Sequence, residues 1–588
     1  MELKALQFIK KNINYCFLTL LMMSMANLLF MHYQFLLTVG LESGPNNWGP
    51  IDNLLACLID ISVLLLASWI LTCFRLRMAL IITFVVTWLW SFSNIFYSRF
   101  FFRYLTLSAI GQVGNMTDST VTNSLLEGFQ IIDLFYPLMA LLFFFLNRRK
   151  RHCDVKQKSV STIGALWLCV LSMVLAIHSL YAFYHKNSLM CELKKSIFSP
   201  SMDDILWPNS TVYHKGTVRK LFLEPLTHSV SARQQLSEEQ KREIEEEYTD
   251  LSQRQTHRTV PEYVKNTIFI LVESYMTSLI DQIIDGKEIT PNLNKLKRDS
   301  TIYYNGNMRP NVSIGRSSDG QLIYMCGLLP LRSEITVSKA KDISLIGLPE
   351  LMKMANPDLY SYTIIPNTPT CWEQQSMTAE YGFDRLFSVF DYEAETRFSV
   401  SGSCLNDEQV FSYASQKDKQ NSKPFLSLIL TVSTHQPYNK HEECGFNISD
   451  SRLPQKYKNY LINCHYADIQ IGKYLDWLRH SGLYDNSLIV ITSDHEPPFN
   501  FMDMVDKLSS NLPLFIINGG ISNKDAWTGE CNQLDVFTTI LDILGIESQW
   551  RGLGHTLLNK NYKNSVTEKK QMMSEWIINS DYFSEKSP

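Results

Sequence analysis

The chain has 588 residues, of which 45% are hydrophobic, and its formal net charge at pH 7 is −4. This length is well above that of one ordinary domain. Because basic residues gather only in a few short loops and form no basic tail or face, the composition argues against a nucleic acid partner.

The first 185 or so residues contain five apolar stretches. Most of them are about 20 residues long, which is the length that spans the hydrocarbon core of a bilayer. They predict five transmembrane helices in an integral membrane protein. The first stretch is long, lacks a small-residue cleavage site and is followed by further spans, which argues against a cleaved signal peptide. The stretches are 15–38, 51–74, 78–100, 131–147 and 161–185.

Basic residues predict the orientation of these helices, because lysine and arginine favour the cytoplasmic side. The loops near 39–50 and 101–130 are nearly free of them, and the latter is either an exposed loop or helices on the outer face of the bilayer. The pattern predicts a multi-pass protein of the inner (plasma) membrane, with residues after 186 on the extracytoplasmic, periplasmic side. The orienting residues are Lys4, Lys10, Lys11, Arg75, Arg77, Arg148, Arg149, Lys150 and Arg151.

Residues 1–186 are thus expected to form the membrane domain, and residues 187–260 to form an extracytoplasmic linker. In the linker, Ser237 stands three residues before Gln240, which is the spacing of a capping box and predicts a short surface helix. Seven of the twelve cysteines lie outside the membrane domain. An odd number without a C-x-x-C spacing leaves one or two disulfides possible and assigns none.

Residues 261–560 predict an α/β catalytic domain, and residues 561–588 a polar tail or peripheral helix. Short apolar runs such as "TIFILVE", "FLSLILTVS" and "SLIVITSD" alternate with helical segments, a pattern typical of a mostly parallel central sheet. The helix before "SLIVITSD" repeats apolar residues at helical spacing over 461–478, and Gly482 is placed to end it.

Three predicted strands end in polar side chains. Glu273 ends the first run, Asp494 and His495 follow "SLIVITS", and His435 follows "FLSLILTVST". In open α/β sheets ligands gather at the carboxyl ends of the strands, so these groups are expected to meet at one edge. Two carboxylates and one imidazole are three ligands for one divalent cation, Zn²⁺ or Mn²⁺, with a position left for a reacting oxygen.

The segment "NVSIGRSSDGQLIYMC" supplies a candidate nucleophile. Asn311 and Gly315 allow a tight turn, after which Ser317, Ser318 and Asp319 open an apolar helix. A helix amino terminus suits phosphate or sulfate, and metal coordination makes a hydroxyl alkoxide-like. Each element alone also has a plainer interpretation, as a surface acid, a capping pair or a turn. Their joint occurrence at strand and helix ends favours a site.

The order of Glu273, "GRSSDG", "CWEQQSMTAEYGFDRLF", "STHQPY" and "YLINCHYADIQIGKYLDWLRHSGLYDNSLIVITSDHE" resembles the lipoteichoic acid synthase-like branch of the alkaline phosphatase and sulfatase superfamily. The phosphoethanolamine transferases of that superfamily are similar in placing five membrane helices before an exported catalytic domain. The resemblance covers about 260–560 by motif and the first 185 residues by architecture.

The resemblance implies that Glu273, Asp494 and His495 ligate the metal, and that Ser317 occupies the position of a nucleophilic threonine that also touches the metal. It further implies that His435 contacts the substrate phosphate and that an aromatic residue lines the head-group pocket. The backbone at Ser318 would help to stabilise the phosphoryl oxygens, and Asp319 would orient the loop. The candidate substrate-binding residues are His435, Trp372, Gln374, Ser318 and Asp319.

Three features depart from the family pattern. Ser317 replaces a threonine and keeps the hydroxyl. Gln374 stands where the phosphoglycerol enzymes carry an arginine, and a pocket histidine is missing near Ile365, so the pocket is neutral and phosphoglycerol is less favoured. Glu496 replaces a glycine after the Asp-His pair, and its negative charge would favour a cationic head group such as ethanolamine unless it points to solvent.

The sequence therefore predicts a metal-dependent phosphotransferase. Ser317 would attack a membrane phospholipid, release diacylglycerol, and pass phosphoglycerol or phosphoethanolamine to an envelope glycan or lipid. An exported sulfatase or phosphodiesterase of the same fold is the first alternative, although the formylglycine signature C/S-x-P-x-R is absent from "GRSSDGQ". A catalytically inert, membrane-anchored binding protein is the second.

Overall fold

The computed structural model forms two compact units, one of residues 1–110 with 125–232 and one of residues 111–124 with 233–588. The expected boundaries at 186, 260 and 560 stay predictions. Lys4, Lys10, Lys11, Arg149, Lys150, Arg151 and most of the stretch 101–130 lie outside the described residues. Those described are 15–39, 50–101, 104–105, 128–148, 158–184, 186–193, 212, 215–218, 235–252, 258–332, 334–396, 404–436, 438, 444–497 and 510–585.

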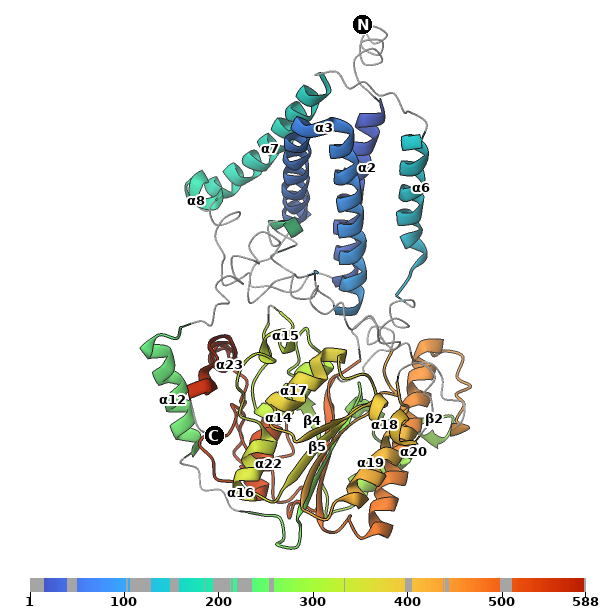
Figure 1. The fold of residues 1–588 in the computed structure, drawn as a ribbon, viewed down its shortest axis with the longest axis vertical. Helices are drawn as coiled ribbons and strands as arrows, with labels where there is room; N and C mark the ends of the chain where they lie inside the picture. The colour runs from blue at the N-terminus through green and yellow to red at the C-terminus, as the bar shows by residue number, and fades with distance from the viewer. Residues whose placement is uncertain are drawn as a thin grey trace. The chain divides into compact units, whose positions relative to one another are not determined.

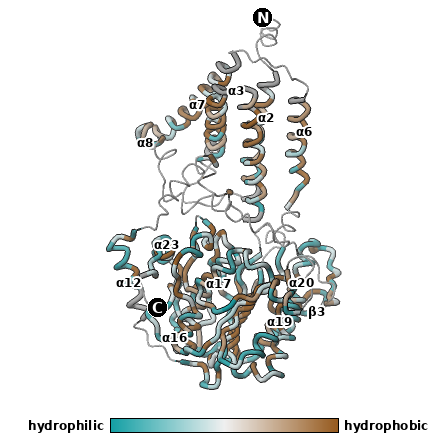
Figure 2. Tube along the Cα trace, viewed as in Figure 1, coloured by the Kyte–Doolittle hydropathy of each residue, from teal (hydrophilic) through white to brown (hydrophobic). Residues whose placement is uncertain are grey.

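The first unit is built from apolar helices, which Figure 2 colours mostly brown. Among the described residues, three segments are long and apolar enough to cross a membrane, Asn53–Leu71, Ile81–Arg99 and Thr162–Tyr184, and Ile131–Phe145 is a shorter apolar helix. The number of five crossings therefore stays a prediction. The elements are α2 (Tyr15–Val39), α3 (Pro50–Phe101), η2 (Ile131–Leu134), α6 (Phe135–Arg148), α7 (Lys158–Tyr184) and α8 (Leu189–Leu193).

Helix α3 contains two of the predicted spans, 51–74 and 78–100. The hydroxyl oxygens of Ser68 and Thr83 lie 3.1 Å apart. Fifteen residues of straight α-helix would separate them by about 22 Å. The axis of α3 therefore reverses between these residues, and its two halves lie side by side (Figure 1).

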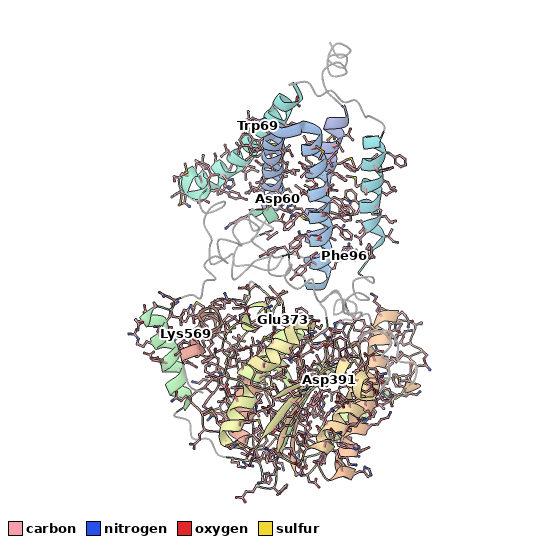
Figure 3. The ribbon with its side chains drawn as sticks, viewed as in Figure 1. Asp60, Trp69, Phe96, Glu373, Asp391 and Lys569 are labelled. Atoms are coloured by element: carbon pink, nitrogen blue, oxygen red, sulfur yellow. The ribbon has the colours of Figure 1, made fainter. Side chains whose placement is uncertain are left out.

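Two buried ionisable pairs connect the helices of the first unit. Asp60, labelled in Figure 3, accepts hydrogen bonds from His32 Nε2 (2.9 Å), the Thr217 backbone N–H (3.0 Å) and the Thr217 hydroxyl (2.6 Å). The guanidinium of Arg99 donates to both carboxylate oxygens of Asp133, at 2.5 and 2.7 Å. Because unpaired polar groups are costly in an apolar bundle, these contacts fix neighbouring segments together.

The second unit contains an eight-stranded sheet of order β10-β4-β9-β8-β1-β7-β5-β6. Strand β1 pairs in parallel with β7 and β8, and β5 pairs in parallel with β6 and β7. Strand β9 runs antiparallel to β4 and β8. The predicted mostly parallel sheet is confirmed. The strands are β1 (Asn266–Val272), β4 (Tyr303–Arg309), β5 (Tyr360–Ile364), β6 (Arg385–Phe387), β7 (Phe425–Leu430), β8 (Ser487–Ser493), β9 (Leu512–Ile517) and β10 (Cys531–Asn532), beside a hairpin of β2 (Ile283–Ile284) and β3 (Lys287–Glu288).

Helices pack on both faces of this sheet (Figure 1). On one face, Ile268 and Ile270 of β1 share a buried cluster with Ile471 of α20. Phe269, which points to the other face, packs on Tyr324 of α14. The helices are α12 (Glu238–Ser252), η4 (Thr277–Leu279), α13 (Pro291–Arg298), α14 (Ser317–Cys326), α15 (Val337–Ala340), α16 (Leu348–Ala355), η5 (Cys371–Glu373), α17 (Gln374–Glu380), α18 (Val389–Thr396), α19 (Asp407–Gln420), α20 (Gln455–Ser481), α22 (Asp535–Leu544), α23 (Glu568–Ser580) and η7 (Tyr582–Glu585).

Two helix ends have the expected form. The predicted helix α20 stops at Gly482, whose φ of +78° suits a residue without a side chain. Before α12, Ser237 and Gln240 exchange the reciprocal bonds of a capping box, at 2.9 and 3.2 Å.

Helix α23, in the stretch expected to be a tail or peripheral helix, packs against the rest of the unit. Met573 and Ile577 are buried, and the Ser574 hydroxyl accepts a hydrogen bond from the Leu329 backbone N–H at 2.8 Å. Arg332 donates to Glu575 at 2.8 Å. Helix α23 therefore supports the chain that follows α14.

Candidate active site

The two central strands β1 and β8 bring the predicted metal ligands together. Val272 and Ser493 are paired residues at the parallel carboxyl ends of these strands, so the residues that follow, Glu273 and Asp494, emerge at the same edge. With His495 they form a buried group, called the ligand group below, whose candidate metal-binding atoms all lie within 4.8 Å of one another.

The first residue of α14, Ser317, reaches this group. Its hydroxyl donates to Glu273 Oε2 at 3.2 Å and lies 3.0 Å from His495 Nε2. The preceding residue, Arg316, has a φ of +47° and a ψ of −111°, a backbone conformation that is costly for an arginine. Such strain persists only where the surroundings fix the chain, and here it accompanies the turn that presents the hydroxyl.

Ser318 and Asp319 hold the turn before Ser317. Asp319 Oδ2 accepts the backbone N–H groups of Ser313 (2.8 Å) and Gly315 (2.9 Å). Ser318 donates to the Gly315 carbonyl through its hydroxyl (2.8 Å) and through its backbone N–H (3.0 Å). The orienting role expected for Asp319 fits these contacts, whereas the Ser318 N–H expected to face a phosphoryl oxygen is used inside the turn.

The contacts of His495 define its tautomer. Nδ1 lies 2.6 Å from the Glu496 carbonyl oxygen, which can only accept, so Nδ1 carries the proton. Nε2 therefore presents its lone pair to the ligand group. Burial also lowers the pKa of His495, which favours the neutral, metal-binding imidazole.

Two carboxylates share this buried place. Burial raises the pKa of Glu273, and the neighbouring Asp494 carboxylate raises it further. Among the ion pairs of the described residues, Glu273 and Asp494 pair only with His495. Two oxygen ligands and one imidazole nitrogen, without a lysine or arginine to neutralise them, fit a divalent cation such as Zn²⁺ or Mn²⁺.

Three supporting residues were not predicted. Gln533 is fully buried, donates to the Asp494 carbonyl at 2.7 Å and accepts from the Asn311 backbone N–H at 2.9 Å. Thr434 donates through its hydroxyl to the Glu273 carbonyl. Gly320 allows α14 to approach β8, because a Cβ there would lie 2.6 Å from the Asp494 carbonyl oxygen. Of these, only Gly320, a glycine inside a predicted helix, left a signal in the sequence.

The predicted substrate-binding residues come from two other strand ends. His435 follows β7, and its neighbour Thr434 contacts the Glu273 carbonyl, so this turn lies beside the ligand group. Trp372 lies in η5, and the buried Gln374 is the first residue of α17. The adjacent Glu373, labelled in Figure 3, pairs with Lys341 at 3.0 Å. A contact of Trp372 and Gln374 with a head group stays a prediction.

The structure changes the expectation for Glu496. Its carboxylate Oε1 lies 3.1 Å from Arg316 Nη1, and Arg316 Nη2 donates to the Glu496 carbonyl at 3.1 Å. The side chains of Arg316 and Glu496 are 20% and 15% exposed. The acid therefore neither points to open solvent nor adds an uncompensated negative charge, and the argument for a cationic head group no longer holds.

Comparisons with known proteins match both the apolar N-terminal part and the α/β part of the chain. A family model described as "Sulfatase" matches residues 265–546, and one described as "Lipoteichoic acid synthase N-terminal domain" matches residues 1–196. Lipoteichoic acid synthase 2 of Bacillus subtilis is 28% identical over 326 residues, which cover 51% of this chain and 48% of that protein. This match thus spans about half the length of that relative.

Two further proteins match most of the chain. Lipoteichoic acid synthase of Staphylococcus aureus is 24% identical over 546 residues, covering 88% of this chain and 81% of that protein. Among solved structures, the integral membrane protein lipooligosaccharide phosphoethanolamine transferase A from Neisseria meningitidis has a TM-score of 0.53 at 14% identity. The superposition covers 90% of this chain and 96% of the transferase, and it shows a shared fold.

Proposed function

The chain belongs to the lipoteichoic acid synthase-like branch of the alkaline phosphatase and sulfatase superfamily, and we propose that it is a membrane phosphotransferase that uses Ser317 as its nucleophile. One observation carries this proposal. The Ser317 hydroxyl lies 3.0 Å from His495 Nε2 and 3.2 Å from Glu273 Oε2, within a buried set of metal-ligand atoms. A hydroxyl in that position is suited to nucleophilic attack.

Glu273, Asp494 and His495 would hold one divalent cation, Mn²⁺ or Zn²⁺. When bound, such an ion lowers the pKa of a neighbouring hydroxyl and stabilises negative charge on phosphoryl oxygens. Glu273 Oε2 accepts the hydrogen of the Ser317 hydroxyl and so directs its lone pairs toward the substrate. Asp319 and Gln533 hold the turn and the strand end that position these groups.

The reaction proceeds in two displacements. The Ser317 oxygen bonds to the phosphorus of a membrane phospholipid, the bond to the diacylglycerol oxygen breaks, and diacylglycerol leaves with a proton. The phospho-head group, phosphoglycerol or phosphoethanolamine, stays on Ser317. An acceptor hydroxyl on an envelope glycan or lipid then attacks the phosphorus, the bond to the Ser317 oxygen breaks, and that oxygen takes up the proton that the acceptor loses. His435, whose Nδ1 bonds to the Gln436 carbonyl, would donate from Nε2 to the phosphoryl oxygens as an imidazolium.

The names of two relatives support transfer of the head group over its hydrolysis, since the similar proteins of Bacillus subtilis and Staphylococcus aureus are both called lipoteichoic acid synthases. A membrane-bound enzyme with its catalytic domain on the extracytoplasmic side would meet lipid donor and acceptor in one leaflet. There, confinement to the membrane raises the effective concentration of both.

The test is peptide mass spectrometry of the detergent-purified full chain, loaded with Mn²⁺ or Zn²⁺ and incubated with phosphatidylglycerol and phosphatidylethanolamine. We expect a phospho-head-group adduct on the peptide that contains Ser317. Ser317→Ala should abolish it, whereas the control variant Ser415→Ala, which removes a hydroxyl bonded within α19, should retain it.

Two other results are informative. Metal bound at one equivalent without an adduct from either lipid would contradict the proposal. An adduct that water alone discharges, with no acceptor product in the presence of envelope glycolipid, would assign the chain to the hydrolases of the same fold.

A further inference from the structure

The residue before Ser317 and the residue after His495 form an ion pair. Arg316 directly precedes Ser317, and Glu496 directly follows His495. Two contacts of 3.1 Å join them, one between side chains and one from the guanidinium to the Glu496 carbonyl. Because Ser317 and His495 are themselves in contact, the pair lies at the edge of the reaction centre.

Backbone contacts hold this pair in place. The carbonyl oxygen of Glu496 that accepts from Arg316 also accepts from His495 Nδ1 at 2.6 Å. The backbone of Arg316 keeps a costly φ of +47°, which persists only where the surroundings hold the chain. The pair is therefore part of the same rigid arrangement that orients the histidine, and its charges have defined positions.

One oxygen of the pair has no hydrogen-bond donor among the described residues. Glu496 Oε2 is buried and accepts no hydrogen bond within the part of the chain that the structure describes. Buried carboxylate oxygens in native proteins almost always have a donor partner. At the edge of a candidate active site, this atom indicates a donor group that a ligand supplies.

The charge balance decides which donor fits. Arg316 compensates Glu496, so an ammonium group would meet a guanidinium together with the carboxylate and gain little net attraction. Hydroxyl groups donate hydrogen bonds without adding charge. The second acid near the predicted head-group residues, Glu373, is compensated in the same way by Lys341 at 3.0 Å. Gln374 carries no charge.

We propose that the Arg316–Glu496 pair determines head-group specificity and selects an uncharged polyol, as in phosphoglycerol, over a cationic aminoalkyl group. Glu496 Oε2 accepts hydrogen bonds from the polyol hydroxyls, and Arg316 excludes the ammonium. This inference rests on the proposed phosphotransferase function.

The experiment measures the ratio of two adducts on the Ser317 peptide. The metal-loaded full chain is incubated with mixed micelles that contain equal amounts of phosphatidylglycerol and phosphatidylethanolamine. In the unmodified chain we expect phosphoglycerol to exceed phosphoethanolamine by about tenfold, the effect of one charge-assisted contact. Arg316→Gln leaves the acid uncompensated, and we expect it to move the ratio by about tenfold toward phosphoethanolamine.

Further variants separate specificity from damage. Glu496→Gln removes the charged acceptor of the polyol hydroxyls and should lower the ratio of phosphoglycerol to phosphoethanolamine, and the double variant, which lacks both charges, should give nearly equal adducts. Arg309 and Glu530 form a matched but exposed pair at 2.7 Å, and Arg309→Gln should not change the ratio. Because a ratio is read, a general loss of activity does not imitate the result.

An unchanged ratio in both Arg316→Gln and Glu496→Gln would overturn the specificity role, as would a preference of the unmodified chain for phosphoethanolamine. If Arg316→Gln does not fold, Glu496→Gln and the double variant decide the question. Failure of the proposed function is distinct, because it leaves no adduct from either lipid although the metal is bound.

Discussion

Gly320 offers a sharp test of how closely α14 must approach β8. Inside a helix, replacing glycine by alanine normally stabilises a protein by about 0.5–1 kcal/mol. At this position the new Cβ would lie 2.6 Å from the carbonyl oxygen of Asp494 and 3.0 Å from its Cα. Both atoms belong to the backbone and cannot rotate away. A relaxed carbon–oxygen contact needs about 3.3–3.6 Å, so helix and strand must separate by about 0.7–1 Å.

This displacement acts on the site directly, because Ser317 begins the helix and Asp494 follows the strand. A hydroxyl 3.0 Å from His495 Nε2 would move beyond hydrogen-bond distance. Misplacing reacting groups by about 1 Å costs about a hundredfold in rate, and overpacking a core costs about 1–3 kcal/mol. For Gly320→Ala we therefore expect a loss of about a hundredfold in diacylglycerol release, with weaker metal binding and a lower thermal midpoint.

The assay follows diacylglycerol release by the full chain at saturating metal, together with metal affinity by chelator competition. Gly472→Ala in α20 is the control. Its Cβ would meet the side chain of Asn292 at 2.5 Å, so it strains the core away from the ligand group and should spare activity per folded molecule. A Gly320→Ala chain that is more stable than the original and equally active would refute the close approach of α14 and β8.

Three further changes have defined outcomes. Gln533→Leu removes the hydrogen bond to the Asp494 carbonyl, and we expect metal affinity, measured by chelator competition, to fall by about tenfold to a hundredfold. Burial raises the pKa of Asp418 to about 6, so the folded state binds its proton more tightly than the unfolded chain. As the pH rises from about 4 to 6, the free energy of unfolding should therefore fall by at most about 3 kcal/mol. In denaturant unfolding, Asp418→Asn should show a smaller change of this free energy over the same pH range. Asp60→Ala leaves the polar groups of His32 and Thr217 buried without their acceptor, and the thermal midpoint in detergent should drop by an amount that reflects about 3–5 kcal/mol.

The ligand group was predictable because its geometry depends on a general property of parallel sheets. Glu273 and Asp494 each follow a continuous apolar run, and the carboxyl ends of neighbouring parallel strands meet at one edge. The candidate nucleophile could be proposed for a similar reason, since Ser317 opens an apolar helix after a turn. These inferences need only the identity of the elements and their ends.

The supporting contacts were not predictable because they depend on side-chain placement between segments far apart in the chain. Arg316 and Glu496 are 180 residues apart, and nothing local to either indicates that they meet. From the sequence Glu496 appeared to be an added negative charge, and only its partner shows that the charge is compensated. Gln533, 39 residues from Asp494, has no local signal at all.

In the apolar N-terminal region, sequence-based prediction was limited in a different way. Hydropathy gave the two apolar stretches of α3 but not how the chain connects them, because apolar composition reports burial and not the path of the backbone. The Ser68–Thr83 contact supplies that path.

The strand order also governs when the site comes into being during synthesis. Strands β1 and β8 are neighbours in the sheet, yet the residues that they present, Ser274 and Asp494, are 220 positions apart. A growing chain carries Glu273 and Ser317 long before β8 has been made and paired with β1. Until then, two of the three ligands do not exist. A metal ion held by these three groups could therefore be acquired, and the chemistry proposed for Ser317 could begin, only after β8 has joined the sheet.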